Sequence, residues 1–146
     1  MIQESKELLF QDLCARLPYH THVKVWLKDG TTEEGVLDLE HNYGDVLRDA
    51  FYYNKIVKIK PYLRPMSSMT EEEFAKLKEY GRLEYDQLGL TSFQNGTYKC
   101  LDFYLSEVPS GAVIRVFDWL NKYHFDYRDL IQMDLAIAVT KGNNPY

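Results

Sequence analysis

Cysteine is scarce in this sequence, which has only Cys14 and Cys100 among its 146 residues. Two thiols exclude a disulfide framework, and a chain of this length buries enough apolar surface to fold without one. Both cysteines lie in apolar stretches, where a free thiol packs as a small hydrophobic residue, so we predict that both are buried. The expected location is a reducing compartment, the cytoplasm.

Long apolar runs are also missing. No stretch approaches the roughly 18 consecutive apolar residues of a membrane span. The segment 1–7 has neither the basic start nor the apolar centre of a signal peptide. We therefore expect no interaction with a membrane.

Positive charge is not concentrated in any segment. The 17 Lys and Arg residues are outnumbered by 22 Asp and Glu, which gives a formal net charge of −5, whereas nucleic-acid-binding proteins usually present a basic surface to phosphate groups. In the densest basic segment, 55–60, lysines alternate with apolar residues, which is typical of a strand with one solvated face; a phosphate-binding patch is the alternative. Nucleic acid is therefore not the expected partner.

The common catalytic motifs are absent as well. The sequence has no Gly-rich phosphate loop, no Ser-centred nucleophile elbow and no Cys-x-x-Cys pair. The acidic run 71–73 does not predict a cation site, because consecutive helix residues do not converge on one point. We expect no cofactor, and a non-enzymatic protein is favoured.

The overall amino-acid composition is typical of one globular domain, 1–146. Its 45% hydrophobic and 27% charged residues are close to the values of folded proteins. The 12 tyrosines suit either a thin core whose rim meets water or a binding surface. Within the domain we expect a helix and sheet in 1–66, and a mainly helical part in 67–146 that packs on them.

Residues 3–17 predict an amphipathic helix, with Ser5 as its N-cap and Pro18 at its end. Leucines recur at spacings of four or five, and polar residues that include Asp12 and Arg16 fill the opposite side.

Residues 22–60 predict an antiparallel sheet. The Asp29-Gly30 pair supplies the positive φ angles of a tight hairpin turn. Pro61 and Pro65 are expected to end the sheet. The expected strands are 23–28, 31–39, 46–53 and 55–60, with a second turn at 41–45.

The second half of the chain predicts two helices with clear boundaries. Thr70 and Glu73 form a capping box at the start of the first, which ends near Gly81. The second begins at Ser110, and its apolar face extends to His124.

The fold class that follows is α+β: an N-terminal helix, an antiparallel β-meander or a small SH3-like or Sm-like barrel, and a helical C-terminal part. Asp126 is expected to cap a last short helix, 127–135. Residues 82–110 are the least readable part, with one strand expected at 99–105.

Three stretches, 12–19, 57–73 and 118–131, resemble a family of small uncharacterised proteins carried by phages and mobile elements of gut bacteroidetes. Members commonly have Gly where this chain has Asp129 and Asp134. The resemblance implies a shared fold and a bacterial host cytoplasm, and it supplies no catalytic residues.

The segments 23–37 and 42–43 are similar to the first motif of Sm-like RNA-binding proteins, which are bent five-stranded barrels with a leading helix. The second Sm motif is missing, because 58–61 reads Lys-Ile-Lys-Pro where an Ile-Arg-Gly-like step belongs. The similarity implies a small barrel without the RNA function.

A metal site would draw on His20 and His22, which share one face of a strand, together with Cys14. His41 would approach across the hairpin as a further ligand. Surface histidines at a strand start are the preferred interpretation, so we expect no metal.

A catalytic site would draw on His124, Asp126 and Arg128, since a carboxylate can orient an imidazole for acid–base chemistry. Each also has a structural explanation: a cap for Asp126, a helix C-terminus for His124, and an ion pair for Arg128. The candidate binding residues are the neighbouring aromatic side chains Trp119, Tyr123 and Tyr127.

The favoured hypothesis is a non-enzymatic accessory protein of a phage or mobile element, a monomer or homodimer that binds an unidentified host or phage protein. The alternatives are a small-barrel module that binds RNA or a nucleotide-like ligand, and an enzyme built on His124, Asp126 and Arg128.

Overall fold

A computed structural model describes residues 3–37, 56–81 and 110–146, together with four two-residue strands between 88 and 103. These residues belong to two compact units. The first contains Met1–Arg64 and Arg128–Tyr146, so the C-terminal segment folds with the N-terminal part of the chain. The second contains Pro65–Tyr127. None of the helices in the described ranges is long and apolar enough to cross a bilayer.

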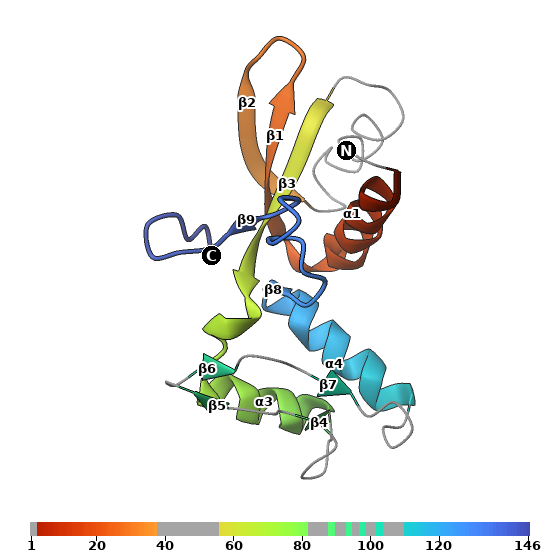
Figure 1. Ribbon diagram of the computed structural model, residues 1–146, viewed down its shortest axis with the longest axis vertical. Coiled ribbons are helices and arrows are strands. Elements are labelled where there is room, and N and C mark those ends of the chain that lie inside the picture. The colour runs from red at the N-terminus through yellow and green to blue at the C-terminus, as the bar shows by residue number, and fades with distance from the viewer. Residues whose placement is uncertain are drawn as a thin grey trace. The chain divides into compact units, whose positions relative to one another are not determined.

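Helix α1 (Gln3–Arg16) opens the first unit and is followed by a 3-10 turn, Leu17–Tyr19 (Figure 1). Pro18 fits this turn, because the first residues of a helical turn have no internal acceptor for their N–H groups. The predicted helix end is therefore confirmed. The predicted polar side is wrong at two positions, since Asp12 and Arg16 are completely buried.

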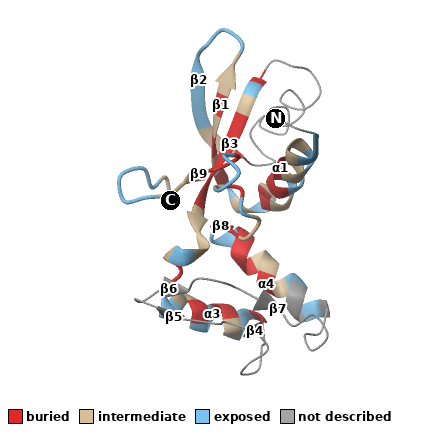
Figure 2. Cartoon of the chain, in the orientation of Figure 1, coloured by how far each residue is buried: buried red, intermediate tan, exposed pale blue. Residues whose placement is uncertain are grey.

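The sheet of the first unit is mixed and open. Strand β1 (Thr21–Leu27) lies between β2 (Thr32–Leu37) and β3 (Ile56–Pro65) and is antiparallel to both, while β9 (Ile137–Ala138) pairs in parallel with β3. The α+β class is confirmed. The closed-barrel alternative is wrong, because barrel closure needs pairing around a ring and the described strands leave β2 at an edge, with its first residues exposed (Figure 2). The central position of β1 also differs from a meander.

The four residues 28–31 join β1 and β2. The Leu27 N–H donates to the Thr31 carbonyl at 2.9 Å, and Gly30 alone in the loop has a positive φ, of 87°. This is a turn closed by a bulge in which only the glycine adopts the left-handed region. Asp29 contributes its carboxylate instead, which accepts hydrogen bonds from the Thr31 N–H at 2.9 Å and the Thr31 hydroxyl at 2.6 Å.

Strand β3 passes through Pro61 and continues to Pro65, so the predicted end of the sheet at Pro61 is wrong. The physical reason is that the N–H and C=O groups of successive residues in a strand point alternately to its two sides. Leu63 directs its carbonyl away from β1, where it accepts from the Val139 N–H at 2.8 Å. Pro61 lies two residues earlier and shares that direction, so its missing N–H costs no hydrogen bond to β1.

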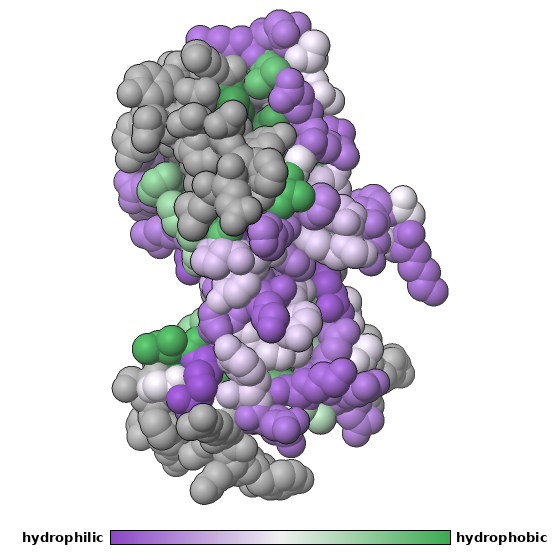
Figure 3. Space-filling model, turned by 180° about the vertical axis from the view of Figure 1, so that it is seen from behind, coloured by the Kyte–Doolittle hydropathy of each residue, from purple (hydrophilic) through white to green (hydrophobic). Residues whose placement is uncertain are grey.

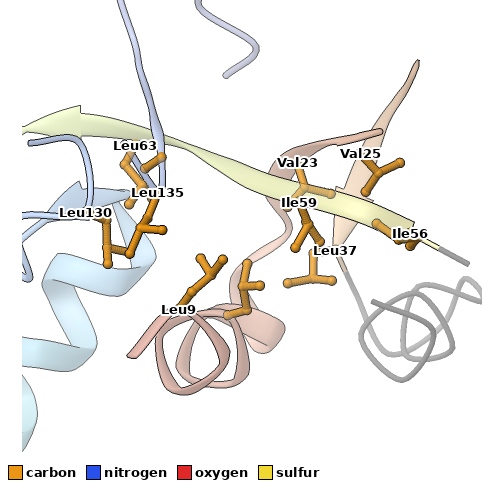
Figure 4. Packing of buried hydrophobic residues seen from close by; sticks show 11 residues of the cluster. Leu9, Val23, Val25, Leu37, Ile56, Ile59, Leu63, Leu130 and Leu135 are labelled. Carbon is orange, nitrogen blue, oxygen red and sulfur yellow. The ribbon is translucent and has the colours of Figure 1, made fainter. Parts of the chain in front are cut away.

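The core of the first unit joins the inner face of the sheet to α1 and to the turn before β9. Figure 4 shows Leu63, Leu130 and Leu135 grouped at one end of β3, while Leu9 lies on α1. The alternation of β1 explains the face: Val23 and the residues two positions away are buried. The buried hydrophobic members are Leu9, Leu13, Val23, Val25, Leu37, Ile56, Ile59, Leu63, Leu130, Leu135 and Ala136.

The second unit contains the helices α3 (Glu71–Gly81) and α4 (Ser110–Lys122). The predicted cap of α3 is confirmed, since the Glu73 N–H donates to the Thr70 hydroxyl at 3.2 Å. Arg115 donates two hydrogen bonds, of 3.2 and 3.1 Å, to the last carbonyl of α3. The core of this unit consists of Met69, Phe74, Leu77, Val116, Trp119, Leu120 and Phe125.

Short antiparallel pairs occupy the chain between α3 and α4. Strand β4 (Leu88–Gly89) pairs with β7 (Asp102–Phe103), and β5 (Phe93–Gln94) pairs with β6 (Thr97–Tyr98). The strand predicted at 99–105 is represented in the described residues by β7. The strand predicted at 46–53 and the turn at 41–45 lie outside the described residues.

The last predicted helix, 127–135, is wrong. Asp126 lies in a short strand, β8 (Phe125–Asp126), and the residues after it form turns. The Leu135 N–H donates to the Leu130 carbonyl at 2.8 Å, and the Asp134 N–H to the Ile131 carbonyl at 3.1 Å. These two hydrogen bonds form a Schellman motif, with Asp134 in the left-handed position at φ 58°. A helix cannot continue through such a residue.

Of the two cysteines, Cys14 lies within the described residues. Cys14 is an exposed residue of α1, so its predicted burial is wrong, although partial burial still raises the pKa of its thiol. It lies on the side of the helix away from Leu9 and Leu13, which occupy the core. Cys100 lies outside the described residues.

Candidate functional site: a groove beside strand β3

A pocket of about 350 Å³ lies in the first unit beside β3. One wall is the strand itself, from Val57 to Lys60, and the other consists of Met133–Leu135, the residues that lead into β9. Ser5 closes it from α1; the sequence predicts this residue as an N-cap, but it lies within the helix. We call this pocket the β3 groove.

The β3 groove follows the edge of the strand that faces away from β1. Strand β9 pairs with this edge at Tyr62 and Leu63, and none of the described strands of the first unit pairs there with Val57–Lys60. Because Leu63 bonds to Val139 on this edge, Ile59, four residues earlier, directs its N–H and carbonyl to the same side. The groove therefore lies where a further strand would continue the line of β9.

Apolar side chains are exposed on both walls of the groove. Val57 is 66% exposed and Met133 is 43% exposed. Val57 is the extra residue of a β-bulge, because Trp26 pairs with Lys58 while the next residue, Leu27, pairs with Ile56. A bulge redirects its side chain, which explains why this valine does not join the core. Elsewhere, Figure 3 shows hydrophilic residues over most of the described surface seen from behind.

Two lysines and one aspartate line the same groove. Lys60 is only 7% exposed, and its ammonium forms a short ion pair with the Asp134 carboxylate. A hydrogen bond from Lys60 is the main cause that lowers the pKa of Asp134, and the charges of Lys60 and Lys58 act in the same direction. The sequence predicts Lys60 on a solvated strand face; its burial, compensated by an aspartate 74 residues later, corrects that prediction.

Lys58 has no carboxylate partner within ion-pair distance among the described residues. Its ammonium lies 4.8 Å from the ring centre of Trp26, and that of Lys24 lies 5.6 Å from the same ring. These contacts place two cations on the aromatic ring at the outer face of β1 and β3. The Lys58 side chain also lines the groove.

A second polar cluster lies on the outer face, around Tyr62. Its hydroxyl donates to the Glu34 carboxylate at 2.8 Å, and Lys24 lies 3.4 Å from the same carboxylate. Burial, and then the hydrogen bond to Glu34, raise the pKa of Tyr62 to about 12. The hydrogen bond from Tyr62 in turn lowers the pKa of Glu34. The tyrosine hydroxyl, the glutamate carboxylate and the lysine ammonium are thus linked in one polar cluster.

The structure describes three of the four predicted metal ligands, Cys14, His20 and His22. His20 is exposed, with a left-handed φ of 54° after the 3-10 turn, and Cys14 is exposed on α1. His22 lies against the Tyr146 ring, with the two ring centres 5.2 Å apart, and burial lowers its pKa. Within the described residues, no group of three His, Cys, Asp or Glu is placed to hold a metal ion. His41 lies outside them.

The predicted catalytic residues fall in different units. His124 and Asp126 belong to the second, where His124 has a φ of 64° just after α4 and Asp126 is buried. Arg128 belongs to the first, where its Nε lies 3.6 Å from the Asp12 carboxylate. The same carboxylate forms a buried ion pair of 2.8 Å with Arg16. The β3 groove is lined by none of the three candidates.

The predicted binding aromatics belong mainly to the second core. Trp119 is 4% exposed and its ring stacks on Phe125, with centres 5.8 Å apart. The Tyr127 hydroxyl donates to the Asn121 side chain at 3.0 Å, and its ring contacts Phe117. Of these three predicted residues, Tyr123 is the one with an exposed ring, at 41%.

Sequence reasoning missed the β3 groove because its walls come from three separate segments. The one available signal was Val57, an apolar residue that lies beside the alternating lysines and that the bulge exposes.

A scan against protein-family models, a search of curated proteins and a search of solved structures each found no match.

Proposed function

We propose that the chain is a non-enzymatic protein-interaction module that binds an extended segment of another protein in the β3 groove. The observation that carries this proposal is the edge of β3 beside a 350 Å³ pocket with an exposed valine on its strand wall. An added strand would bond to the backbone groups of Ile59 and bury Val57 and Met133, which is how sheet edges recognise extended peptides.

The biological setting belongs to the same proposal. The resemblance of 12–19, 57–73 and 118–131 to phage and mobile-element proteins supports an accessory protein of that origin, which acts in the cytoplasm of a bacterial host. The partner would then be a host or phage protein with an accessible extended segment.

A second candidate function follows from Trp26. An aromatic ring between two lysines, Lys24 and Lys58, is an arrangement that stacks on nucleotide bases while the ammonium groups contact phosphate. The net charge of −5 opposes this function, because phosphate binding depends on positive charge.

Peptide selection against the immobilised protein tests the first function. Peptides selected from a random display library are synthesised, and their affinities are measured by fluorescence anisotropy for the wild type, V57Q and I114Q. Val57 and Ile114 are both exposed apolar residues, at 66% and 70%, and only Val57 lines the groove. We expect V57Q to weaken binding about fivefold, because it removes apolar contact, and I114Q to leave it unchanged.

Equal affinities for all three proteins would contradict binding in the groove. A labelled single-stranded oligonucleotide, tested at low salt against the wild type and W26A, separates the second function. Binding that depends on Trp26 and disappears at high salt would favour the nucleotide-binding interpretation.

A further inference from the structure

We infer that the β3 groove selects an extended segment with two acidic side chains separated by one apolar residue. This inference rests on the proposed function and names the chemistry of its partner. It follows from the positions of Lys58 and Lys60 on the groove wall and from the direction of the side chains between them.

The strand wall presents lysine, isoleucine and lysine in order. The side chain of Ile59 points into the core and is 3% exposed, so Lys58 and Lys60 share the opposite face. A strand that pairs with this edge has side chains directly opposite these lysines, at a Cβ separation of about 5 Å. Two carboxylates at positions i and i+2 of that strand would each meet one ammonium group.

The residue between the two acids would face the inner side of the sheet. Ser5 and Leu135 lie on that side of the groove, and Leu135 is buried in the adjoining core. A small or branched apolar side chain suits this position, because a charged one would lose water without a partner. The pattern is therefore acidic, apolar, acidic.

Asp134 does not satisfy both lysines. Its carboxylate forms an ion pair with Lys60 and is itself 86% exposed, and no ion pair of Asp134 with Lys58 is found among the described residues. The Lys58 ammonium lies 4.8 Å from the ring centre of Trp26. An acidic segment would therefore complete a charge arrangement that has two cations and one anion.

A second copy of the chain is a poor occupant of the same edge. If two β3 edges paired with each other, Lys58 and Lys60 of one copy would face the same residues of the other, and like charges in opposite positions destabilise a sheet. Edge lysines are a common means by which proteins prevent such self-pairing. The charges thus favour an acidic partner over a homodimer.

The inference is tested with three blocked, fluorescently labelled heptapeptides, TVEVEVT, TVQVQVT and TVKVKVT. Their affinities are measured by fluorescence anisotropy at low salt. We expect the glutamate peptide to bind about fivefold more tightly than the glutamine peptide, because each glutamate adds an ion pair with a groove lysine, and the lysine peptide to bind most weakly. The difference should decrease in about 0.5 M NaCl, where exposed charges are screened.

Two lysine variants locate the effect. K58Q should remove most of the preference for glutamate, while K28Q, at an exposed lysine of the hairpin loop outside the groove, should retain it. Hydrogen exchange followed by NMR supplies the second readout. The Ile59 amide should exchange rapidly in the free protein and slowly with the glutamate peptide bound.

The possible failures are distinguishable. Equal binding of the glutamate and glutamine peptides, both weakened by V57Q, would overturn the acidic preference and leave the proposed function in place. Failure of all three peptides would overturn the acidic pattern, while display-selected peptides would still decide the proposed function. A slowly exchanging Ile59 amide in the free protein, or a dimer in sedimentation that V57Q dissociates, would show that the edge is already occupied and would overturn both.

Discussion

The hydroxyl of Tyr146 accepts a hydrogen bond of 3.2 Å from the backbone N–H of His22, across 124 positions of the sequence. The same hydroxyl donates to the Tyr62 carbonyl at 2.7 Å. In the register of β1 and β3, in which Val23 pairs with Pro61, His22 would stand opposite Tyr62. The tyrosine hydroxyl therefore takes the place of a direct hydrogen bond between the two strands.

Tyr146→Phe should destabilise the protein by about 1–3 kcal/mol, because it leaves a strand N–H and a carbonyl without their partner. Urea unfolding followed by circular dichroism measures the change. Tyr80→Phe is the matched control: its hydroxyl donates at 2.6 Å to the Asp118 side chain and not to a strand backbone group, so the loss should be much smaller. Equal losses would show that the Tyr146 hydroxyl has no special importance.

Stability should fall at alkaline pH because of Tyr62. Its pKa is raised from 10.0 to about 12, so the neutral phenol is favoured by the folded state. A raised pKa contributes stability that is complete below the unfolded pKa and is lost as the pH rises from about 10 to about 12. The unfolding free energy of the wild type should therefore decrease more steeply over this interval than that of Y62F. Parallel curves would contradict the prediction.

Asp12→Ala should cost about 3–5 kcal/mol, because it leaves the buried guanidinium of Arg16 without its carboxylate. Glu72→Ala is the control, since Glu72 and Lys76 form an exposed pair with the same spacing of four residues, at 3.5 Å. That loss should be about 0.5 kcal/mol or less. Chemical denaturation of both variants gives the comparison, and similar values for the two would contradict the importance of burial.

Asp129→Gly should stabilise the protein by roughly 1 kcal/mol. Asp129 has a φ of 59°, a region that costs L-residues about 1–2 kcal/mol and glycine almost nothing. Asp134→Gly relieves similar strain at φ 58°, but it also removes the ion pair with Lys60. Thermal unfolding should therefore show a higher midpoint for D129G than for D134G. The reverse order would contradict this explanation.

Local signals explain what could be predicted from the sequence. The cap at Thr70, the stop at Gly81 and the hairpin at Gly30 each depend on residues a few positions apart, and each is present in the structure. The α+β class follows from the same kind of information, because the period of apolar residues distinguishes helix from strand.

Partners distant in sequence explain what could not be predicted. The local sequence pattern predicts solvated positions for Asp12, Arg16 and Lys60, yet all three are buried. Arg128 approaches the pair of Asp12 and Arg16, and Asp134 forms an ion pair with Lys60. A charge is buried only where such a partner compensates it. The turn at 130–135 likewise depends on the left-handed Asp134, which local propensity does not reveal.

The sequence by itself therefore determined the helices α1, α3 and α4, the hairpin and the absence of common catalytic motifs, since these depend on neighbouring residues. Only the tertiary structure decided that the chain after Arg128 returns to the N-terminal sheet. That return adds β9 beside one end of β3 and sets Met133–Leu135 opposite Val57–Lys60. The groove exists because contacts between segments remote in sequence jointly stabilise the folded state. The local sequence of one segment does not show which other segments it will contact.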